Sequence, residues 1–273
     1  MTDRFAGKAD WFDSHYESTR GRVRLSLVLE RLRSGLPTPP ARILDAGGGT
    51  GAFAIPLAKD GYDVTLLDAS AEWIQLASEK AARSGVSVAC ILGAVEDVSD
   101  AVQPPFDAIL CHAVLMYVEK PATCLGDLRS LANRGAILSL LEKNKDGIAL
   151  RPGLCGDYRE AKRLLDDAVS TGRLGVENVA RAVEEWVALL SQTGWHALDW
   201  AGVRLFSDTA PDDLSPEEFD ALLNLEQGGW DAGVIPARRS SPSSPCPNSL
   251  LMLFPSQTTI AIWPRAFVRR AIL

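Results

Sequence analysis

Short apolar runs alternate with helical patterns through the first half of the chain. The runs that predict strands are Arg42–Asp45, Tyr62–Leu67, Val86–Leu92, Phe106–Cys111 and Ala136–Leu141. Between them, apolar residues at helical spacing predict helices over Ala52–Asp60, Ala71–Arg83 and Ala122–Ala132. Because strands joined by helices of this length pair side by side through right-handed crossovers, this half of the chain predicts a parallel sheet.

The pattern changes on both sides of this alternating region. Before it, apolar residues among arginines predict a helix over Gly21–Ser34, which the prolines of residues 36–40 end. After Lys143 the alternation stops, and residues 143–178 predict a loop, a helix over Tyr158–Val169 and a glycine-containing turn. A helix, a sixth strand and a last helix are then predicted over Val179–Gln192, Trp195–Phe206 and Pro216–Glu226.

These changes divide the chain into three parts. Residues 1–40 are predicted to form an N-terminal docking segment and helix, because their first half mixes aromatic and polar side chains. Residues 41–228 form the main domain, with a helical insertion at 143–178. Residues 229–273 form an atypical tail with the low-complexity linker R-R-S-S-P-S-S-P-C-P-N-S. The candidates in this tail for a last strand are Leu250–Phe254 and Thr258–Trp263.

Composition narrows the class of protein. At 273 residues, with 47% hydrophobic and 23% charged residues, the chain is typical of one folded domain with additions. Its net charge of −7 disfavours a general polyanion binder. Five cysteines without a C-x-x-C pair predict neither a disulfide framework nor a zinc site, so we expect no metal. With no run of about 18 apolar residues and no apolar N-terminal segment, we expect a cytoplasmic protein without a membrane span or signal peptide.

The stretch that says most about chemistry is Ile43–Gly51, I-L-D-A-G-G-G-T-G, between the first predicted strand and helix. Glycines let the backbone turn tightly and approach a ligand, and a helix N-terminus offers free N–H groups, so this order predicts a nucleotide cradle. A P-loop is excluded, because Gly51 is not followed by Lys and Ser or Thr. A dinucleotide cradle stays open, because Gly47, Gly49 and Ala52 satisfy G-x-G-x-x-G/A.

A cradle for S-adenosylmethionine fits the charges better. Asp45 lies two residues before Gly47, where a carboxylate can reach the cationic methionine end of that ligand or order the loop. The same charge would repel the pyrophosphate of NAD. Asp68 ends the second predicted strand, where it can accept hydrogen bonds from the ribose hydroxyls that both ligands carry. These residues favour S-adenosylmethionine without excluding NAD.

Four strings resemble the motifs of the class I S-adenosylmethionine-dependent methyltransferases. They are L-D-A-G-G-G-T-G, G-A-V-E-D-V, F-D-A-I-L-C-H-A-V-L-M-Y-V-E-K-P and G-A-I-L-S-L-L-E-K-N. Further strings within residues 15–228 make the chain similar to the bacterial tRNA 5-carboxymethoxyuridine methyltransferase family. The resemblance implies an α/β fold with a Rossmann-like, mostly parallel seven-stranded sheet and helices on both faces. It also implies an antiparallel last strand and a small helical lid at the insertion.

A cofactor site follows from the same resemblance. Arg24 would bind the methionine carboxylate, Gly47 and Gly48 would contribute backbone contacts, and Asp68 would bind the ribose. Together with the residues of the glycine stretch, the expected cofactor-binding set is Arg24, Asp45, Gly47, Gly48, Gly49, Gly51, Asp68, Val95, Glu96, Asp97 and His112.

The adenine and sulfonium ends of the cofactor are assigned by resemblance as well. Val95 and Glu96 would flank adenine, with Asp97 as a second candidate for its amino group, and His112 would face the sulfonium. Methyl transfer from a sulfonium is a one-step displacement, so alignment and exclusion of water are the main tasks of the protein. A carboxylate acceptor needs no general base. For a phenol or an amine, His112 is the candidate catalytic base.

The acceptor is the least determined part of the prediction. Tyr117 and Tyr158 are candidates for its walls, and Arg204 for pairing with an anionic acceptor. Residues 143–178 carry seven Lys/Arg and six Asp/Glu, whereas a tRNA binder is expected to present a basic face. We therefore expect a small-molecule acceptor methylated on oxygen or nitrogen, with carboxylates included. A tRNA wobble-uridine carboxyl methyltransferase is the alternative, a cofactor-binding protein without catalysis is a third, and the oligomeric state stays open.

Overall fold

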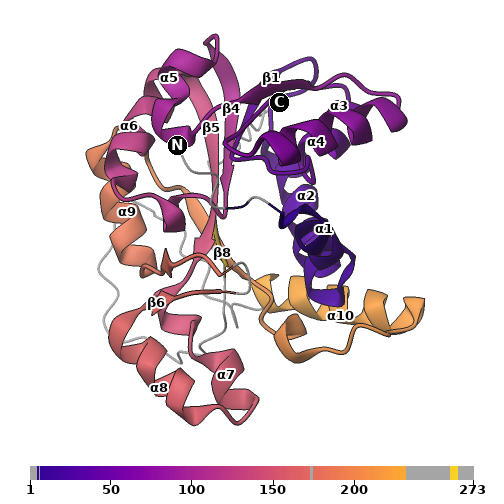
Figure 1. The fold of residues 1–273 in the computed structure, drawn as a ribbon, viewed down its shortest axis with the longest axis vertical. Coiled ribbons are helices and arrows are strands. Elements are labelled where there is room, and N and C mark those ends of the chain that lie inside the picture. The colour runs from indigo at the N-terminus through magenta and orange to yellow at the C-terminus, as the bar shows by residue number, and fades with distance from the viewer. Residues whose placement is uncertain (1–4, 6, 173–174, 232–258, 264–273) are drawn as a thin grey trace, which may run out of the picture.

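A computed structural model describes residues 5, 7–172, 175–231 and 259–263 of the chain (Figure 1). Its main sheet has the strand order β3-β2-β1-β4-β5-β9-β8. The bounds are β1 Arg42–Ala46, β2 Asp63–Asp68, β3 Ala89–Leu92, β4 Phe106–His112, β5 Ala132–Lys143, β8 Asp199–Val203 and β9 Thr259–Trp263. Strands β1 to β5 pair in parallel, and β9 is antiparallel to both β5 and β8. The predicted α/β Rossmann-like fold with a mostly parallel sheet is confirmed.

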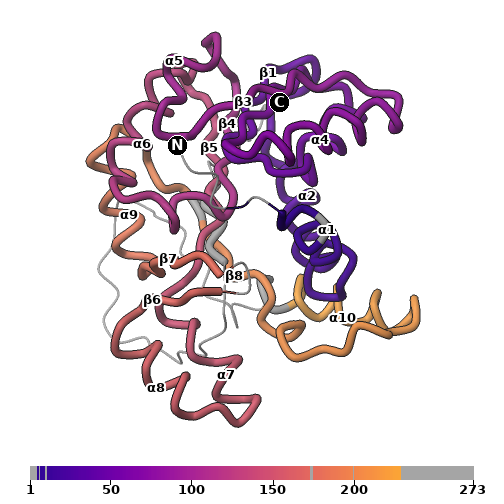
Figure 2. Tube along the Cα trace, in the orientation of Figure 1, coloured from indigo at the N-terminus to yellow at the C-terminus, as the bar shows by residue number. Residues whose placement is uncertain are grey.

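Helices cover both faces of this sheet (Figures 1 and 2). One face carries α1 Ala9–Glu17, α2 Thr19–Gly35, α3 Ala54–Lys59 and α4 Ala71–Arg83, with α10 Pro216–Asp231 beside α2. The other face carries α5 Val98–Ala101, α6 Pro121–Ser130 and α9 Val183–Gln192. Between β5 and α9, the chain forms α7 Leu150–Leu154, α8 Tyr158–Asp167 and the small antiparallel pair β6 Val169–Ser170 and β7 Asn178–Val179.

Local chemistry explains where several elements begin. The side chain of Ser18 caps α2 by accepting a 3.2 Å hydrogen bond from the N–H of Gly21. Helix α4 has its predicted bounds. Helix α3 begins at Ala54 instead of the predicted Ala52, since residues 49–53 form turns that start at Gly49 and include Gly51, whose φ values of +58° and +85° lie outside the right-handed helix region.

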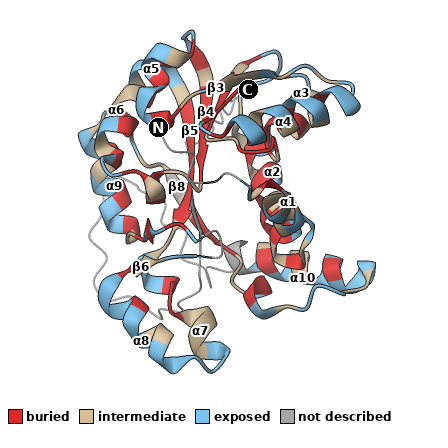
Figure 3. Cartoon of the chain, viewed as in Figure 1, coloured by how far each residue is buried: buried red, intermediate tan, exposed pale blue. Residues whose placement is uncertain are grey.

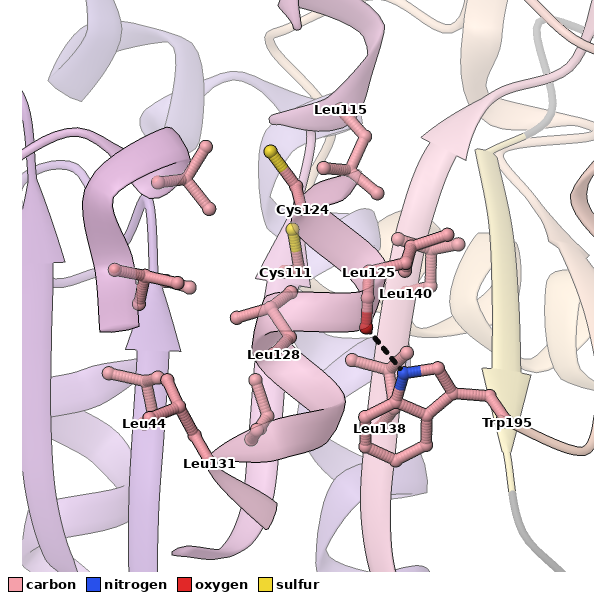
Figure 4. Packing of buried hydrophobic residues seen from close by; sticks show 14 of the residues in the cluster. Leu44, Cys111, Leu115, Cys124, Leu125, Leu128, Leu131, Leu138, Leu140 and Trp195 are labelled. Atoms are coloured by element: carbon pink, nitrogen blue, oxygen red, sulfur yellow. Dashed lines mark hydrogen bonds between the residues drawn. The ribbon is translucent and has the colours of Figure 1, made fainter. Parts of the chain in front are cut away.

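Two hydrophobic cores lie on the two faces of the sheet (Figure 3). In the first, α6 and α9 pack on β4 and β5, and the indole N–H of Trp195 donates a 3.0 Å hydrogen bond to the carbonyl of Leu125 (Figure 4). In the second, α2 and α3 pack on β1 and β2. The cores hold the sheet rigidly from both sides, so the loops at its carboxyl edge have a fixed base.

Two segments differ from the predicted pattern. Residues 9–17 form helix α1, where a docking segment without assigned structure was expected. The insertion contains α7 and the β6–β7 pair in addition to the predicted helix, and α9 begins at Val183 because Val179 belongs to β7. In the tail, Thr258–Trp263 contains β9, whereas Leu250–Phe254 and the low-complexity linker lie outside the described residues. No helix in the described part of the chain is long and apolar enough to span a membrane.

Candidate functional site

A cavity of about 950 Å³ lies at the carboxyl edge of the parallel strands. Its lining includes Gly47 after β1, Asp68 at the end of β2, Glu96 after β3, His112 at the end of β4 and Lys143 at the end of β5. This is the edge where open α/β sheets bind ligands, at the point where the strand order reverses between β1 and β4. Small-molecule sites occupy roughly 300–1,000 Å³, so there is room for a nucleotide cofactor and an acceptor together.

The glycine turn after β1 is held by backbone hydrogen bonds to the end of β2. The N–H groups of Gly47 and Gly48 both donate to the carbonyl of Leu67, at 2.7 and 3.1 Å. Gly47 has φ of +77°, and a Cβ there would come within 2.3 Å of Cγ2 of Val114. The turn therefore packs against the loop after β4, and it requires glycine both for conformation and for space.

Asp45 lies beneath this turn. Its side chain is buried and does not line the cavity, and a Cβ on Gly48 would approach its carboxyl group to 2.8 Å. Burial, then the charge of Asp68, raises the pKa of Asp45 to about 7. Neither oxygen has a hydrogen-bond partner among the described residues, although the N–H of Ala54 favours the charged form. Of its two predicted roles, ordering the loop fits this position, and direct contact with the cofactor does not.

Asp68 joins the end of β2 to the glycine turn. Its two carboxylate oxygens accept 2.9 Å hydrogen bonds from the N–H groups of Gly49 and Ser70. A carboxylate has about four acceptor positions, so a cavity-lining Asp68 can still accept from a ribose. Gly48, Gly49 and Gly51, which were expected to bind the cofactor, do not line the cavity, and Gly49 acts through its bond to Asp68.

The turn after β3 places one of the two predicted acidic candidates at the cavity. Val95 and Glu96 line it, whereas Asp97 does not. The buried side chain of Val95 offers an apolar surface, and Glu96 is exposed. The pair fits the predicted adenine position, and Glu96 is the better placed acceptor for an amino group.

Arg24, on α2, reaches the cavity from the opposite side. It is 9% exposed, its guanidinium lies 5.0 Å from the ring centre of Tyr16, and its Nε has no hydrogen-bond partner within the described ranges. An unpartnered donor on a buried cation is costly unless an anion binds it. Arg24 therefore fits the predicted contact with a carboxylate.

His112, at the end of β4, is held as a neutral ring. Its Nε2 lies 2.7 Å from Oγ of Ser139, and its ring packs edge-on to Phe53 at 4.6 Å. Burial, then the charge of Arg24, lowers the pKa of His112 to about 3. A group with this pKa is a weak base at neutral pH, so the geometry argues against the predicted base role. The buried Nδ1 has no partner among described atoms, which leaves a contact with the cofactor or acceptor open.

We expect His112 to make the fold less stable in acid. Between pH 6.5 and pH 3 the unfolded histidine binds a proton and the folded one does not, so acidification through this window lowers the free energy of unfolding by up to about 1.4 kcal/mol per pH unit. Between pH 6 and pH 4.5, urea unfolding should show a smaller fall in the free energy of unfolding for His112→Gln than for the wild type. Parallel pH profiles of the two proteins would contradict the lowered pKa.

Glu142, near the end of β5, is a site-forming residue that the sequence pattern did not reveal. It is completely buried, and it accepts hydrogen bonds from the N–H groups of Val114, Leu115 and Met116, at 3.1, 2.7 and 3.0 Å. Burial raises the pKa of Glu142 to about 8, while these three N–H groups act in the opposite direction. One carboxyl group thus fixes the loop that contacts Gly47 and lines the cavity.

Four aromatic residues, which we call the aromatic cover, line the cavity at its expected cofactor end: Phe5, Phe12, Trp73 and Tyr117. Phe5 lies 5.2 Å from Trp73 and 5.3 Å from Tyr117 between ring centres, and Phe12 stacks on Trp73 at 4.5 Å. Tyr117 was predicted as an acceptor wall, and it does line the cavity. Tyr158, the other predicted acceptor wall, does not line the cavity and is 74% exposed, so it forms no wall of this cavity.

An acidic side chain ties α1, which carries Phe12, to the glycine turn. Asp13 accepts a 2.5 Å hydrogen bond from Oγ1 of Thr50 and pairs at 2.5 Å with Nζ of Lys80 on α4. Both members of this ion pair are 29% exposed. The cover and the turn are therefore one connected unit.

Cations gather at the other end of the cavity. Arg204, which follows β8, pairs with the buried Asp208, and the backbone carbonyl of Asp208 accepts a 3.3 Å hydrogen bond from Nε of Arg151. Lys143 donates to Oγ of Ser170 at 2.9 Å. Burial lowers the pKa of Arg204, with Arg24 and Arg20 acting in the same direction against Asp208. The four cavity-lining cations Arg20, Lys143, Arg151 and Arg204 form what we call the acceptor end. Of these four, the sequence predicted only Arg204 as an acceptor contact.

Comparison with known proteins gives consistent results. A family model of a methyltransferase domain matches residues 38–185. The chain is 32% identical over 240 residues to tRNA 5-carboxymethoxyuridine methyltransferase of Escherichia coli strain K12, covering 83% of this chain and 89% of that protein. It is 29% identical over 204 residues to ubiquinone biosynthesis O-methyltransferase of Xylella fastidiosa strain 9a5c, covering 74% and 80%. Its fold is similar to that of an S-adenosylmethionine-dependent methyltransferase of Thermotoga maritima, a possible histamine N-methyltransferase, with TM-score 0.59, 14% identity and coverage of 96% and 97%.

Proposed function

This chain belongs to the class I S-adenosylmethionine-dependent methyltransferases, and we propose that its acceptor is a small molecule whose carboxylate oxygen receives the methyl group. S-adenosylmethionine is the cofactor of the family, and when bound it supplies an electrophilic methyl group on a positively charged sulfur. We propose that Arg24 binds its methionine carboxylate, Asp68 its ribose, and Val95 with Glu96 its adenine. When it is ionised, the buried carboxyl group of Asp45 beneath the glycine turn favours a cationic ligand.

The observation that carries the carboxylate proposal is the charge of the acceptor end. Arg20, Lys143, Arg151 and Arg204 all line the cavity, and Asp208 is the acid that pairs with Arg204. Asp157 and Glu160 line the cavity as well, but Glu160 pairs with Arg163, so the cations outnumber the acids and create a positive field. Such a field attracts an anionic acceptor and disfavours a cationic amine.

The protonation states agree with an acceptor that needs no base. His112 is a neutral, weak base, and burial, followed by the charge of Glu142, raises the pKa of Tyr117 to about 12, so its hydroxyl keeps its proton. A phenol or an ammonium group would have to lose a proton to a base during methyl transfer. A carboxylate is already ionised at neutral pH and can attack directly.

A carboxyl group of tRNA is the second candidate, and the similarity to the Escherichia coli tRNA enzyme favours it. The charges on α8 are less suited to phosphate binding. Lys162 pairs with Asp166, and Arg163 pairs with both Glu160 and Asp167, so acids of the same helix neutralise these cations. We therefore place the small-molecule acceptor first.

The division of the chain also stays a proposal. Residues 143–178 would act as the lid of the acceptor end, because Ile148, Arg151 and Leu164 from this insertion line the cavity. Residues 1–40 would cover the cofactor end through α1, and residues 41–228 would form the methyltransferase domain. The tail, 229–273, would complete the seven-stranded sheet through β9.

Radiolabelled methyl transfer tests both candidates. We expect the protein with methyl-tritiated S-adenosylmethionine to label a small-metabolite fraction, and mild alkali to release the label as volatile methanol, because methyl esters hydrolyse readily. Asp68→Ala, which removes the proposed ribose ligand, is the background control. Label in tRNA alone would move the acceptor to the second candidate, and alkali-stable label would reject carboxylates. Cofactor binding without transfer to either fraction would favour a protein without catalysis.

A further inference from the structure

A small chamber adjoins the main cavity at the acceptor end. Its volume is about 70 Å³, room for about two waters or one carboxylate-sized group. Its lining consists of Arg24, Ala113, Met116, Lys143, Asn144, Ile148 and Arg204. Three of these seven residues are cations and none of the seven is an acid. All except Asn144 also line the main cavity, so the chamber is a side pocket of the same site.

The three cations keep donors for a ligand. The ammonium group of Lys143 has three N–H donors, of which two bind Ser170 and Asn178, at 2.9 and 2.7 Å. Nε of Arg24 and Nε of Arg204 have no partner in the described part of the chain. Leaving such groups buried and unpaired is costly, so the chamber is built for an anion.

Arg204 is held in place at a conformational cost. Its φ is +69°, a left-handed value that non-glycine residues rarely adopt. The next three N–H groups, of Leu205, Phe206 and Ser207, are all bound by the fully buried carboxylate of Glu226, at 2.8–2.9 Å. A strained residue that its surroundings fix in this way is a candidate for a ligand contact.

We propose that this chamber binds a second anionic group of the acceptor, one that is not methylated. The inference rests on the proposed function and deepens it. With Arg24 proposed to bind the methionine carboxylate, Lys143 and Arg204 remain for the acceptor, and Asp208 already pairs with Arg204. A carboxylate held by these two cations is a poor nucleophile, and its methylation would remove a negative charge that they bind. An anion that keeps its charge through the reaction fits the chamber better. It anchors one end of the acceptor, and the reacting carboxylate lies in the main cavity.

The acceptor is thus a small molecule with two acidic groups. The anchoring group is a carboxylate or a phosphate, which share the chemistry that Lys143 and Arg204 recognise. The competing occupant of the chamber is the methionine carboxylate of the cofactor, since Arg24 faces both spaces. A test therefore has to separate acceptor binding from cofactor binding.

Binding of simple anions to the protein loaded with S-adenosylhomocysteine makes this separation. Calorimetry would compare propionate, succinate, glutarate and inorganic phosphate. We expect at least one two-carboxylate probe to bind about tenfold more tightly than propionate, or phosphate to do so if the anchor is a phosphate. Lys143→Met and Arg204→Met should abolish that preference. Arg83→Met should keep it, because Arg83, at the end of α4, is 66% exposed and lines neither the main cavity nor the chamber.

Two results would overturn the proposal. One is equal affinity of the wild-type protein for all four anions. The other is a loss of more than tenfold in S-adenosylhomocysteine affinity in Lys143→Met, with unchanged melting temperature, because the chamber would then belong to the cofactor. Both readouts are independent of methyl transfer. Failure here would leave the alkali-labile product of the proposed function untouched, and failure of the proposed function would appear as absence of that product even where the anion preference is observed.

Discussion

Gly47→Ala is expected to weaken S-adenosylhomocysteine binding by at least about 100-fold, which corresponds to about 2.7 kcal/mol. The added methyl group would approach Val114 to 2.3 Å, so either the glycine turn or the loop after β4 must move. Both line the cavity, and the two N–H bonds to the carbonyl of Leu67 depend on the present position of the turn. Isothermal titration calorimetry measures the affinity directly.

Gly85→Ala is the matched control. Gly85 has φ of +71°, close to that of Gly47, but a Cβ there has no neighbour within 4 Å. Both variants bear the strain of a left-handed alanine, which costs about 1–2 kcal/mol. We expect a lower melting temperature in both and a changed affinity in Gly47→Ala alone. An affinity within threefold of the wild type in Gly47→Ala would show that the turn does not contact the cofactor.

Glu142→Gln is expected to lower the free energy of unfolding by about 2–4 kcal/mol. An amide can accept through one oxygen, whereas the carboxylate uses Oε1 for Val114 and Leu115 and Oε2 for Met116. The NH₂ group would face an N–H donor in a fully buried position. Urea denaturation at pH 9, above the raised pKa of Glu142 of about 8, measures the loss, and weaker cofactor binding should accompany it because the freed loop packs on Gly47.

The variant Glu226→Gln separates the loss of stability from the loss of cofactor binding. Glu226 is as buried as Glu142, and it also binds three consecutive N–H groups, on the loop that follows Arg204. We expect a similar loss of stability with unchanged affinity for S-adenosylhomocysteine. If both variants weakened cofactor binding equally, the effect would be one of general instability, and the assigned role of the Glu142 loop would be wrong.

The sequence predicted well what depends on nearby residues. Helix α4 has its predicted bounds because its apolar spacing and the glycine that follows act locally. The strand, turn and helix around Gly47 were also predictable, since glycines at these spacings permit few other structures. The positions of Asp68 and His112 at the cavity followed from their places at strand ends, because parallel strands share one carboxyl edge.

Long-range partners could not be predicted in this way. Nothing local to Glu142 indicates that its carboxylate binds residues 114–116, and the chamber joins Arg24, Lys143 and Arg204 from three distant parts of the chain. Asp45 is the opposite case. Its spacing from Gly47 indicated a possible ligand contact, but its side chain is buried behind the turn and does not line the cavity. Such outcomes depend on how the layers pack, which one sequence does not reveal.

The link between α1 and the glycine turn makes buffer salt a kinetic variable. If the demethylated cofactor leaves through the aromatic cover, Phe12 on α1 has to separate from Trp73 on α4, and the Asp13–Lys80 ion pair between the same two helices would have to break. Ions in solution screen a partly exposed pair of this kind. Turnover limited by release of the demethylated cofactor would therefore rise with ionic strength. Higher ionic strength also weakens the attraction of an anionic acceptor. The highest turnover is expected at the ionic strength where these two effects balance.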